Sequence, residues 1–289
     1  MSEKVYVLGA TGNIGTEVVQ ELLNSGIHVT AYVRDPAKVK QHDLLTLVKG
    51  DYDDLTPFEK SIAGHTRLFL LVADLGKMAR VKKTIAARAY EAGVKQIVDV
   101  SSFTVSAGGR RTAIGAAHTI AEDAIIAMEN RGTLVALRPA RFMTNQIWQD
   151  AATIKEQGVV CDTVDPDEPQ TWISTSDIAR LAVICLKDPV EKHGDIVYEM
   201  AAQCITPKER AAILSKVLGR PVSYKRLSVE DRYNYMVEKV GAPHFLAFTI
   251  AASVYKGFED EPTPGLSLLL GREPETIEQW LEKNKNVFL

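Results

Sequence analysis

Short apolar runs alternate with longer amphipathic stretches over the first 140 residues of the chain. Residues 4–8 (KVYVL) and 28–33 (HVTAYV) are rich in β-branched and aromatic residues, which predicts two strands. Between them, apolar residues recur at helical spacing over residues 14–23, and Gly26 stands where a helix should end. We therefore predict a strand–helix–strand unit at the start of the chain.

The same pattern repeats further along this region. Strands are predicted over 45–50, 68–73, 95–102 and 134–140, and helices over 78–92, closed by Gly93, and 116–130, closed by Gly132. Continuous apolar strands that alternate with helices are typical of a parallel sheet covered on both faces. The sequence predicts an α/β fold with a Rossmann-type doubly wound parallel sheet.

The regular alternation ends after Pro139, and helical patterns follow. Residues 206–220 carry a full set of helix-end signals, namely Thr206 as N-cap, Pro207 at the first helical position, Glu209 for a capping box and Gly219 after the last turn. Further helices are predicted over 174–188, 229–240, 243–256 and 274–284. We expect residues 151–289 to form a small, mostly helical lobe that is packed on the sheet and is not independent.

Composition and charge narrow the class of protein. Of 289 residues, 46% are hydrophobic and 25% are charged, as in ordinary globular proteins, and the net charge of −3 favours neither nucleic acid nor an anionic membrane as partner. No apolar run reaches the roughly 18 residues of a membrane span, and the three cysteines lack metal-type spacing. We expect a cytoplasmic monomer or homodimer with reduced cysteines.

Three glycines directly follow the first predicted strand, in the run GATGNIG. The first allows a tight turn, the second lets a pyrophosphate approach the backbone, and the third lets helix and strand pack closely. The start of the next helix supplies N–H groups and the positive end of the helix dipole. We predict that residues 1–150 form an NAD(P)-binding domain with a phosphate site at Gly9, Thr11, Gly12, Asn13, Ile14 and Gly15.

The residue that follows the second strand discriminates between NAD and NADP. An NAD site needs a carboxylate there to accept from the ribose 2′-OH, whereas Arg34 offers a guanidinium that can bind a 2′-phosphate. Asp35 is its neighbour, so a shift of one residue would favour NAD instead. Lys38 and Lys40 add positive charge nearby, and we predict NADP(H).

The spacing Gly-x-x-Gly-x-x-Gly is that of the extended and atypical short-chain dehydrogenases. Together with the runs VRDPAK, VKGDYDD, HTIAEDAI and LRPARFMTN and the C-terminal tail, it resembles the NmrA-like family, and within it the triphenylmethane reductase and NADPH:quinone reductase branch. The resemblance covers nearly the whole chain. It implies NADP(H), with Asp51 and Tyr52 near the adenine, residues 70–73 (including Val72 and Ala73) under the ribose, and Ser101 and Pro139 toward the nicotinamide.

The helix predicted over 116–130 lacks the Tyr-x-x-x-Lys pair that typical short-chain dehydrogenases use. The one match, Tyr235 with Lys239, lies far beyond the expected catalytic edge of the sheet, and we ascribe it to chance. Carbonyl reduction needs a proton for the nascent alkoxide, so a site without a tuned acid suits an acceptor whose product is delocalised or neutral. We predict an NADPH-dependent oxidoreductase that transfers a hydride to a small electrophilic aromatic acceptor, such as a quinone or dye.

His118 and Glu122 in this helix allow three interpretations. Ala117, Ala121, Ala124 and Met128 form the expected core stripe, which leaves His118 and Glu122 on a neighbouring face as a solvated pair worth a few tenths of a kcal/mol. A metal site would need a third ligand, and the spacing offers none, so we predict no metal. Alternatively, His118 binds the ribose or carboxamide of the cofactor, or acts as a general acid held by Glu122. We favour the cofactor-binding role and keep His118 as the candidate catalytic residue.

Residues that follow the sixth strand are the candidates for the substrate side, because ligands bind at the carboxyl ends of such strands. Aromatic, thioether and amide side chains suit a flat acceptor, and the candidates are Phe142, Met143, Asn145, Trp148 and Trp172. Core packing is the alternative for each of the apolar ones. The loop 104–112, with two glycines and two arginines, is either a lid or a surface loop.

Fold alone does not establish catalysis. Some members of the NmrA-like family bind dinucleotides and regulate protein partners, so the alternative function is a non-catalytic NADP(H)-binding redox sensor. An isomerase or epimerase of the extended branch would need the missing Tyr/Lys pair, which argues against that third class.

Overall fold

The chain forms two compact units in a computed structural model that describes residues 4–108, 110, 112–252 and 261–289. The first unit contains Met1–Pro139 and Ser176–Glu199, and the second contains Ala140–Thr175 and Met200–Leu289. The segment 176–199 therefore belongs to the same unit as the N-terminal part of the chain. The boundary that we place at residue 150 stays a prediction.

A seven-stranded sheet is the centre of the first unit, with strand order β10-β6-β5-β4-β1-β2-β3. All pairings among the first six strands are parallel. The strands are β1 (Lys4–Leu8), β2 (His28–Val33), β3 (Leu45–Lys49), β4 (Arg67–Leu70), β5 (Gln96–Val100), β6 (Thr133–Pro139) and β10 (Ile196–Met200). The order 3-2-1-4-5-6 is that of a doubly wound dinucleotide-binding sheet, which confirms the predicted fold class.

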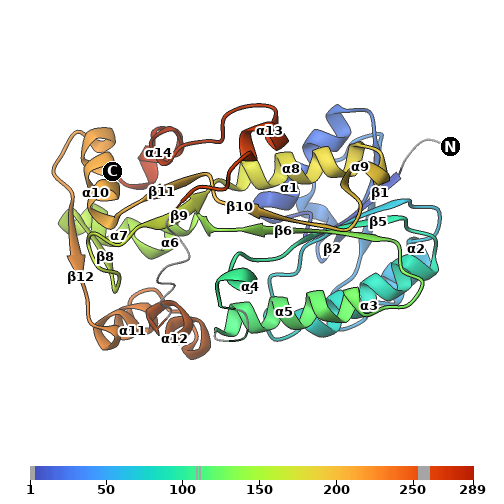
Figure 1. Cartoon of the computed structure of the whole chain (residues 1–289), viewed down its shortest axis with the longest axis horizontal. Helices are drawn as coiled ribbons and strands as arrows, with labels where there is room; N and C mark the ends of the chain where they lie inside the picture. The colour runs from blue at the N-terminus through green and yellow to red at the C-terminus, as the bar shows by residue number, and fades with distance from the viewer. Residues whose placement is uncertain (1–3, 109, 111, 253–260) are drawn as a thin grey trace. The chain divides into compact units, whose positions relative to one another are not determined.

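Helices cover both faces of this sheet. In Figure 1, α3 and α5 lie on one face, and α1 and α8 lie on the other. The helices of this unit are α1 (Asn13–Asn24), α2 (Thr56–Ser61), α3 (Met78–Glu91), α4 (Thr104–Ala107), α5 (Ala113–Ile126), α8 (Thr175–Lys187) and α9 (Val190–His193). Side chains of β1, β4, α2, α3 and α5 form one hydrophobic core cluster between the sheet and its helices.

Helix α5 begins three residues earlier than the sequence pattern predicts. The Oγ1 atom of Thr112 accepts a hydrogen bond from the Gly115 N–H at 3.0 Å and so caps the helix at residue 113. The predicted stop at Gly132 is also wrong, because the helix already ends at Ile126. Gly132 instead lies so close to another strand end that a Cβ atom there would sit 2.5 Å from the carbonyl oxygen of Lys95.

The second unit is mostly helical, as predicted, but it also contains two small sheets that the periodicity did not indicate. One has the order β11-β9-β7 and the other pairs β12 with β8. The strands are β7 (Arg141–Phe142), β8 (Val159–Asp162), β9 (Gln170–Ile173), β11 (Gln203–Ile205) and β12 (Ser223–Arg226). These strands are two to four residues long, too short for an alternating pattern to stand out in a single sequence.

Four of the helices that the structure describes in the second unit lie within predicted segments, and three others, at residues 145–149, 151–157 and 266–270, were not predicted. Helix α10 has the capping box between Thr206 and Glu209 and ends at Gly219 in a left-handed conformation. The helices are α6 (Asn145–Gln149), α7 (Ala151–Gln157), α10 (Pro207–Leu218), α11 (Val229–Glu238), α12 (His244–Ala252), α13 (Leu266–Leu270) and α14 (Ile277–Asn284). The end of the helix predicted over 243–256 lies outside the described residues.

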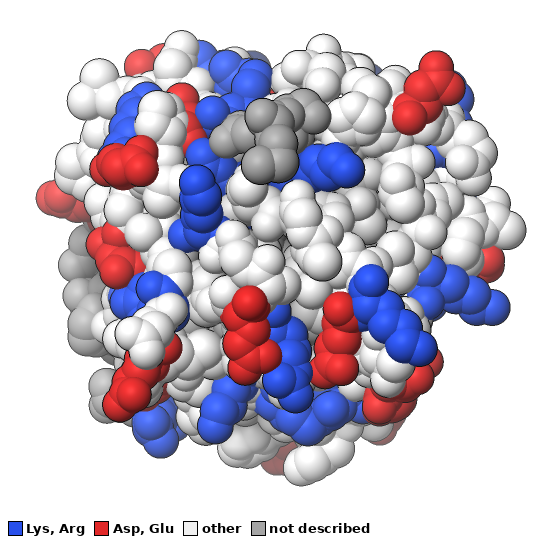
Figure 2. All heavy atoms as spheres, turned by 90° about the vertical axis from the view of Figure 1, so that its right-hand side faces the viewer, with Lys and Arg blue, Asp and Glu red and all other residues white. Residues whose placement is uncertain are grey.

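The charges on one face of the molecule are mixed in sign. On the face shown in Figure 2, Lys and Arg side chains lie among Asp and Glu side chains, without a large patch of one sign. In the described part of the chain, no helix is long and apolar enough to span a membrane.

Candidate functional site

The loop between β1 and α1 has the geometry that its glycines predict. Gly9 has a φ of +76°, in the region that favours glycine. A Cβ atom on Gly15 would lie 2.1 Å from the Gly9 carbonyl oxygen, so the helix can approach the strand end only with glycine at this position. The loop therefore turns sharply and seats the first turn of α1 directly against it.

The N-terminus of α1 is suited to an anion. Gly12 is the N-cap residue and provides no side-chain hydrogen bond to the first turn, which also contains no acidic residue. The first N–H groups of a helix have no partner within the helix, and the helix dipole favours negative charge there. This end of α1 fits a phosphate group.

A pocket of about 550 Å³ opens at the carboxyl ends of β1 to β4. It brings together seven of the residues that the sequence predicts for the cofactor, namely Gly9, Thr11, Gly12, Arg34, Asp51, Tyr52 and Ala73. Its other lining residues are Tyr32, Val33, Gly50, Asp53, Leu71, Asp74 and Lys77. The strand ends alone could indicate these additional residues, because all of them follow or end a strand of the parallel sheet.

Arg34 and Asp35 differ in what they contact. Arg34 is exposed and lines the pocket. Asp35 is not among the lining residues; its Oδ1 atom accepts from the Ala37 N–H at 3.2 Å and caps a short 3-10 helix, Pro36–Lys38. Lys38 lies 3.8 Å from Asp35. The residue after β2 that lines the pocket is thus Arg34. Its guanidinium suits a 2′-phosphate better than a ribose hydroxyl.

Tyr32 and Gly50 also line the pocket, and no sequence pattern indicated a role for them. A Cβ atom on Gly50 would lie 2.2 Å from the Tyr32 hydroxyl oxygen. That hydroxyl donates to the carbonyl oxygens of Asp51 and Asp54, at 2.9 and 3.0 Å. The Asp51 carboxylate accepts from the backbone N–H groups of the next turn, so it also stabilises its own loop. Gly50 therefore allows the ring to support the loop that lines the pocket.

Tyr52 lines the pocket together with Arg34. The Tyr52 hydroxyl donates to the Leu71 carbonyl oxygen at 3.2 Å, and the Arg80 guanidinium donates to the Tyr52 carbonyl oxygen at 2.8 Å. Burial raises the pKa of Tyr52, and the nearby positive charge of Arg34 opposes that rise. The ring is therefore a fixed, neutral wall beside the guanidinium.

The remaining predicted cofactor residues do not line this pocket. Asn13 is the first residue of α1, and Ile14, Gly15 and Val72 are buried behind the loops that do line it. Ser101, His118 and Pro139 lie farther along the sheet, at the ends of β5 and β6 and on α5. Their predicted contacts with the nicotinamide half stay a prediction.

The interpretation of His118 and Glu122 as a solvated pair is wrong. Their residues are 8% and 2% exposed, and they share the buried face of α5 with Gly115, Ala121 and Ile125. No hydrogen bond joins them among the described residues, so Glu122 does not hold the imidazole as an acid would require. In the same part of the chain, no group of three or more metal-ligating side chains is close enough to hold a metal ion.

A buried ion pair lies near His118, and no sequence pattern indicated it. Lys82 of α3 donates to the Asp99 carboxylate of β5, with Nζ 2.7 Å from Oδ1 and 2.9 Å from Oδ2, and to the Val100 carbonyl oxygen at 2.8 Å. Both side chains are fully buried. Because the two residues are 17 positions apart on different elements, no local motif could reveal them.

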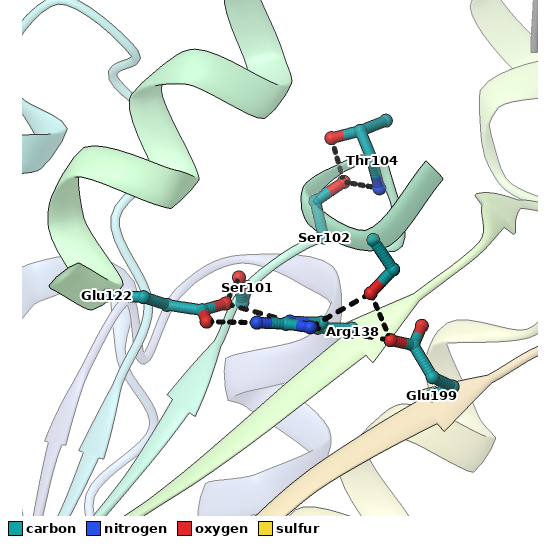
Figure 3. A network of polar contacts seen from close by, with 7 residues as sticks. Ser101, Ser102, Thr104, Glu122, Arg138 and Glu199 are labelled. Atoms are coloured by element: carbon teal, nitrogen blue, oxygen red, sulfur yellow. Dashed lines mark hydrogen bonds and ion pairs between the residues drawn. The ribbon is translucent and has the colours of Figure 1, made fainter. Parts of the chain in front are cut away.

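Glu122 is bound by Arg138 instead of His118. The guanidinium Nε and Nη2 atoms of Arg138 donate to the two carboxylate oxygens at 3.1 and 2.5 Å. Ser101 donates its hydroxyl to the same carboxylate, and Arg138 also donates to Ser106. Figure 3 shows this network at the end of β5, with Glu199 of β10 on its other side. It is a charged cluster that only the folded chain assembles.

The protonation of His118 should make folding depend on pH. Burial lowers the pKa of His118 well below its usual value, and the charge of Lys82 lowers it further. The native state then binds fewer protons than the unfolded state, so stability is present above about pH 6.5 and falls as the pH drops below it. The slope for one such group approaches about 1.4 kcal/mol per pH unit.

We expect His118→Gln to reduce this acid-side slope by up to one proton, measured by urea unfolding between pH 5 and 7.5. The same change at the exposed His42 is the control for the loss of a surface histidine. An unchanged slope in His118→Gln would show that the imidazole binds the same number of protons in the native and in the unfolded state.

The candidate substrate residues lie in the second unit in different environments. Met143 and Trp172 are buried in its core cluster, where the Arg210 guanidinium stacks over the Trp172 ring at 5.0 Å. Trp148 is 40% exposed and donates to the Asn145 side chain at 3.3 Å, while Phe142 is half-buried in β7. Their contact with a substrate stays a prediction.

The loop 104–112 is partly helical. Thr104–Ala107 forms α4, and Ser106 within it is anchored to Arg138 and Glu199. Arg110 pairs with Asp123 at 3.2 Å, whereas residues 109 and 111 lie outside the described residues. The first half of the segment is therefore fixed to the sheet.

Comparison with known proteins gives a consistent result. A profile of the NmrA-like family matches residues 1–281. The chain is 28% identical over 288 residues, 98% of this chain and 99% of the relative, to a (4-alkanoyl-5-oxo-2,5-dihydrofuran-3-yl)methyl phosphate reductase of Streptomyces griseus. It is 28% identical over 246 residues, 84% of this chain and 83% of the relative, to an NAD(P)H azoreductase of Xenophilus azovorans.

A solved structure is similar over the same length. The NADPH-dependent quinone oxidoreductase QOR2 of Escherichia coli, complexed with NADPH, superposes with a TM-score of 0.85 at 25% identity, over 98% of this chain and 100% of that one.

Proposed function

The chain belongs to the NmrA-like family, and from that premise we propose that it reduces a small electrophilic aromatic acceptor, of the quinone or dye kind, with NADPH as reductant. It is an oxidoreductase that uses NADP(H), as its full-length relatives and the NADPH complex of a similar quinone oxidoreductase support. The acceptor class is our inference from the site.

The observation that carries the proposal is the pocket at the ends of β1 to β4. It combines a glycine loop that only glycine can form, the N-terminus of α1 and the guanidinium of Arg34 at the end of β2. These groups fit the pyrophosphate and the 2′-phosphate of NADPH. When bound, NADPH supplies the hydride; the residues of this chain bind it, orient it and exclude water.

We infer the class of acceptor from the proton donors that α5 offers to a substrate. Helix α5 contains no tyrosine or lysine, and His118 is neutral at pH 7 because its pKa is far below the usual value. Neither offers a tuned acid to an alkoxide. An acceptor whose product anion is delocalised needs no such acid at the moment of reduction. The names of two relatives, azoreductase and quinone oxidoreductase, denote acceptors of that electronic kind.

We expect the purified protein to oxidise NADPH in the presence of some members of a panel of quinones, triphenylmethane dyes and azo dyes, and NADH far more slowly. Absorbance at 340 nm with each acceptor, and without any, measures this directly. Binding of NADPH without turnover on the whole panel would contradict the proposal. It would instead favour a sensor that binds NADP(H) and regulates a protein partner.

A further inference from the structure

Arg138 connects four elements at the carboxyl edge of the sheet. It lies near the end of β6, and its guanidinium donates to Glu122 of α5 and, at 2.8 Å, to Ser106 of α4. Its Nη1 atom lies 3.5 Å from the Glu199 carboxylate of β10, which also accepts from Ser106. One half-buried side chain therefore links α4, α5 and β10 to β6, as Figure 3 shows.

The same network holds the end of β5. A carboxylate can only accept, so Ser101 must donate its hydroxyl proton to Glu122. The backbone of this segment continues to pair with β6, because the Ser101 N–H donates to the Leu137 carbonyl at 2.7 Å and the Phe103 N–H to the Pro139 carbonyl at 3.0 Å. Residues 101–107 are thus fixed to Arg138 at both ends of the segment, through Glu122 at one and Ser106 at the other.

The position of this segment matters for the reaction. A dinucleotide lies across the carboxyl edge of a doubly wound sheet, with one half on each side of the point where the strand order reverses. The described pocket occupies the ends of β1 to β4 and carries Arg34, which suits the adenosine half. The other half then falls at the ends of β5 and β6, where residues 101–107 and Arg138 lie.

We propose that Arg138 is a positioning residue for the reduction: through Glu122 and Ser106 it fixes residues 101–107 as the wall of the nicotinamide half of the site. This inference rests on the proposed function for the identity of the reaction. A planar guanidinium that binds a carboxylate through two donors holds it in one geometry, which an ammonium does not. A displacement of about 1 Å at a reacting centre can cost about 100-fold in rate.

Arg131 provides a matched control on the other end of the same strand. Its side chain is 17% exposed, the same as that of Arg138. It pairs with Asp195 at 2.6 Å, just before β10, and stands before the first residue of β6. The Asp195 side chain is 55% exposed and that of Glu122 only 3%, so loss of Arg131 should cost less stability than loss of Arg138. Only Arg138 lies at the edge where ligands bind.

The experiment compares Arg138→Gln, Arg138→Lys and Arg131→Gln in the full chain. For Arg138→Gln we expect a fall of about 10- to 100-fold in kcat/KM for the best acceptor of the panel, with the NADPH Kd nearly unchanged because the adenosine half is intact. Arg138→Lys should recover part of the loss, and Arg131→Gln should retain wild-type kinetics with a smaller fall in Tm than Arg138→Gln. Hydrogen exchange of the amides of residues 101–107 should accelerate only in the Arg138 variants.

Equal kinetic losses in Arg138→Gln and Arg131→Gln, or unchanged exchange in residues 101–107, would overturn the proposal. If Arg138→Gln does not fold, Ser106→Ala removes the exposed anchor of α4 alone and should lower kcat/KM by a smaller factor with the same exchange signature. If the wild type reduces nothing, the proposed function fails, and the exchange measurement still decides whether Arg138 fixes the segment.

Discussion

Replacing Lys82 by methionine is expected to lower the free energy of unfolding by about 3–5 kcal/mol, the largest effect of any single change considered for this protein. The ammonium group donates to Oδ2 of Asp99 and to the Val100 carbonyl oxygen and lies 2.7 Å from Oδ1 of Asp99, and neither side chain reaches solvent. Methionine fills similar volume but leaves the Asp99 carboxylate buried without a counter-charge. The cost is therefore that of an unpaired buried charge and not of a lost contact.

The pH dependence of the loss identifies its cause. Burial already raises the pKa of Asp99, and the charge of Lys82 opposes that rise, so without Lys82 the carboxyl group must fold protonated. A native state that binds one more proton than the unfolded state loses stability as pH rises, by about 1.4 kcal/mol per unit. Urea unfolding of Lys82→Met should show a smaller loss at pH 5.5 than at pH 8.

Two further variants serve as controls for this result. Lys82→Met combined with Asp99→Asn should recover much of the stability and abolish the pH dependence, because no charge remains to be buried. Lys77→Met removes an exposed ion pair with Asp53 at the start of α3 and should cost less than about 1 kcal/mol. A loss of the same size for Lys77 and Lys82 would refute the argument from burial.

Replacing Arg34 by alanine is expected to weaken NADPH binding by about 10- to 100-fold and NADH binding little. The guanidinium follows β2, lines the pocket beside Tyr52 and can make charge-assisted hydrogen bonds with a 2′-phosphate. NADH has a hydroxyl group at that position and gains nothing from a guanidinium. Fluorescence titration with each cofactor gives the ratio of the two Kd values.

Asp35→Asn is the matched control for Arg34→Ala. Asp35 is the next residue, but its carboxylate caps the 3-10 helix Pro36–Lys38 and is not part of the pocket lining. We expect it to leave the ratio of NADPH to NADH affinity unchanged. The opposite result would be a changed ratio for Asp35→Asn together with an equal loss of NADPH and NADH affinity for Arg34→Ala. It would show that the Asp35 carboxylate, and not Arg34, binds the ribose.

Much of the first unit could be predicted because its determinants are local. Strands and helices were recognisable from the periods of their apolar residues, and their spacing predicted the doubly wound sheet. Gly9 and Gly15 lie within seven residues of one another, so their steric roles could be predicted locally. The structure confirms a tight turn at Gly9 and close packing at Gly15. The capping box of Thr206 and Glu209 is local for the same reason. The short strands of the second unit were missed because they give too little pattern to detect.

Of the predicted core stripe of α5, Ala117, Ala121 and Met128 do contact the core, but the burial of His118 and Glu122 was decided by tertiary structure alone. Hydrophobic periodicity assigns His118 and Glu122 to a neighbouring face, because polar side chains are rarely buried unless they are paired. Here Glu122 is paired by Arg138 and Ser101, which come from two other elements, 16 and 21 residues away. Lys82 and Asp99 are paired in the same way across α3 and β5. The sequence alone determined the sheet, the glycine loop and the cofactor class. The charged cluster beside them depends on which distant residues the fold brings together, and no local periodicity encodes that.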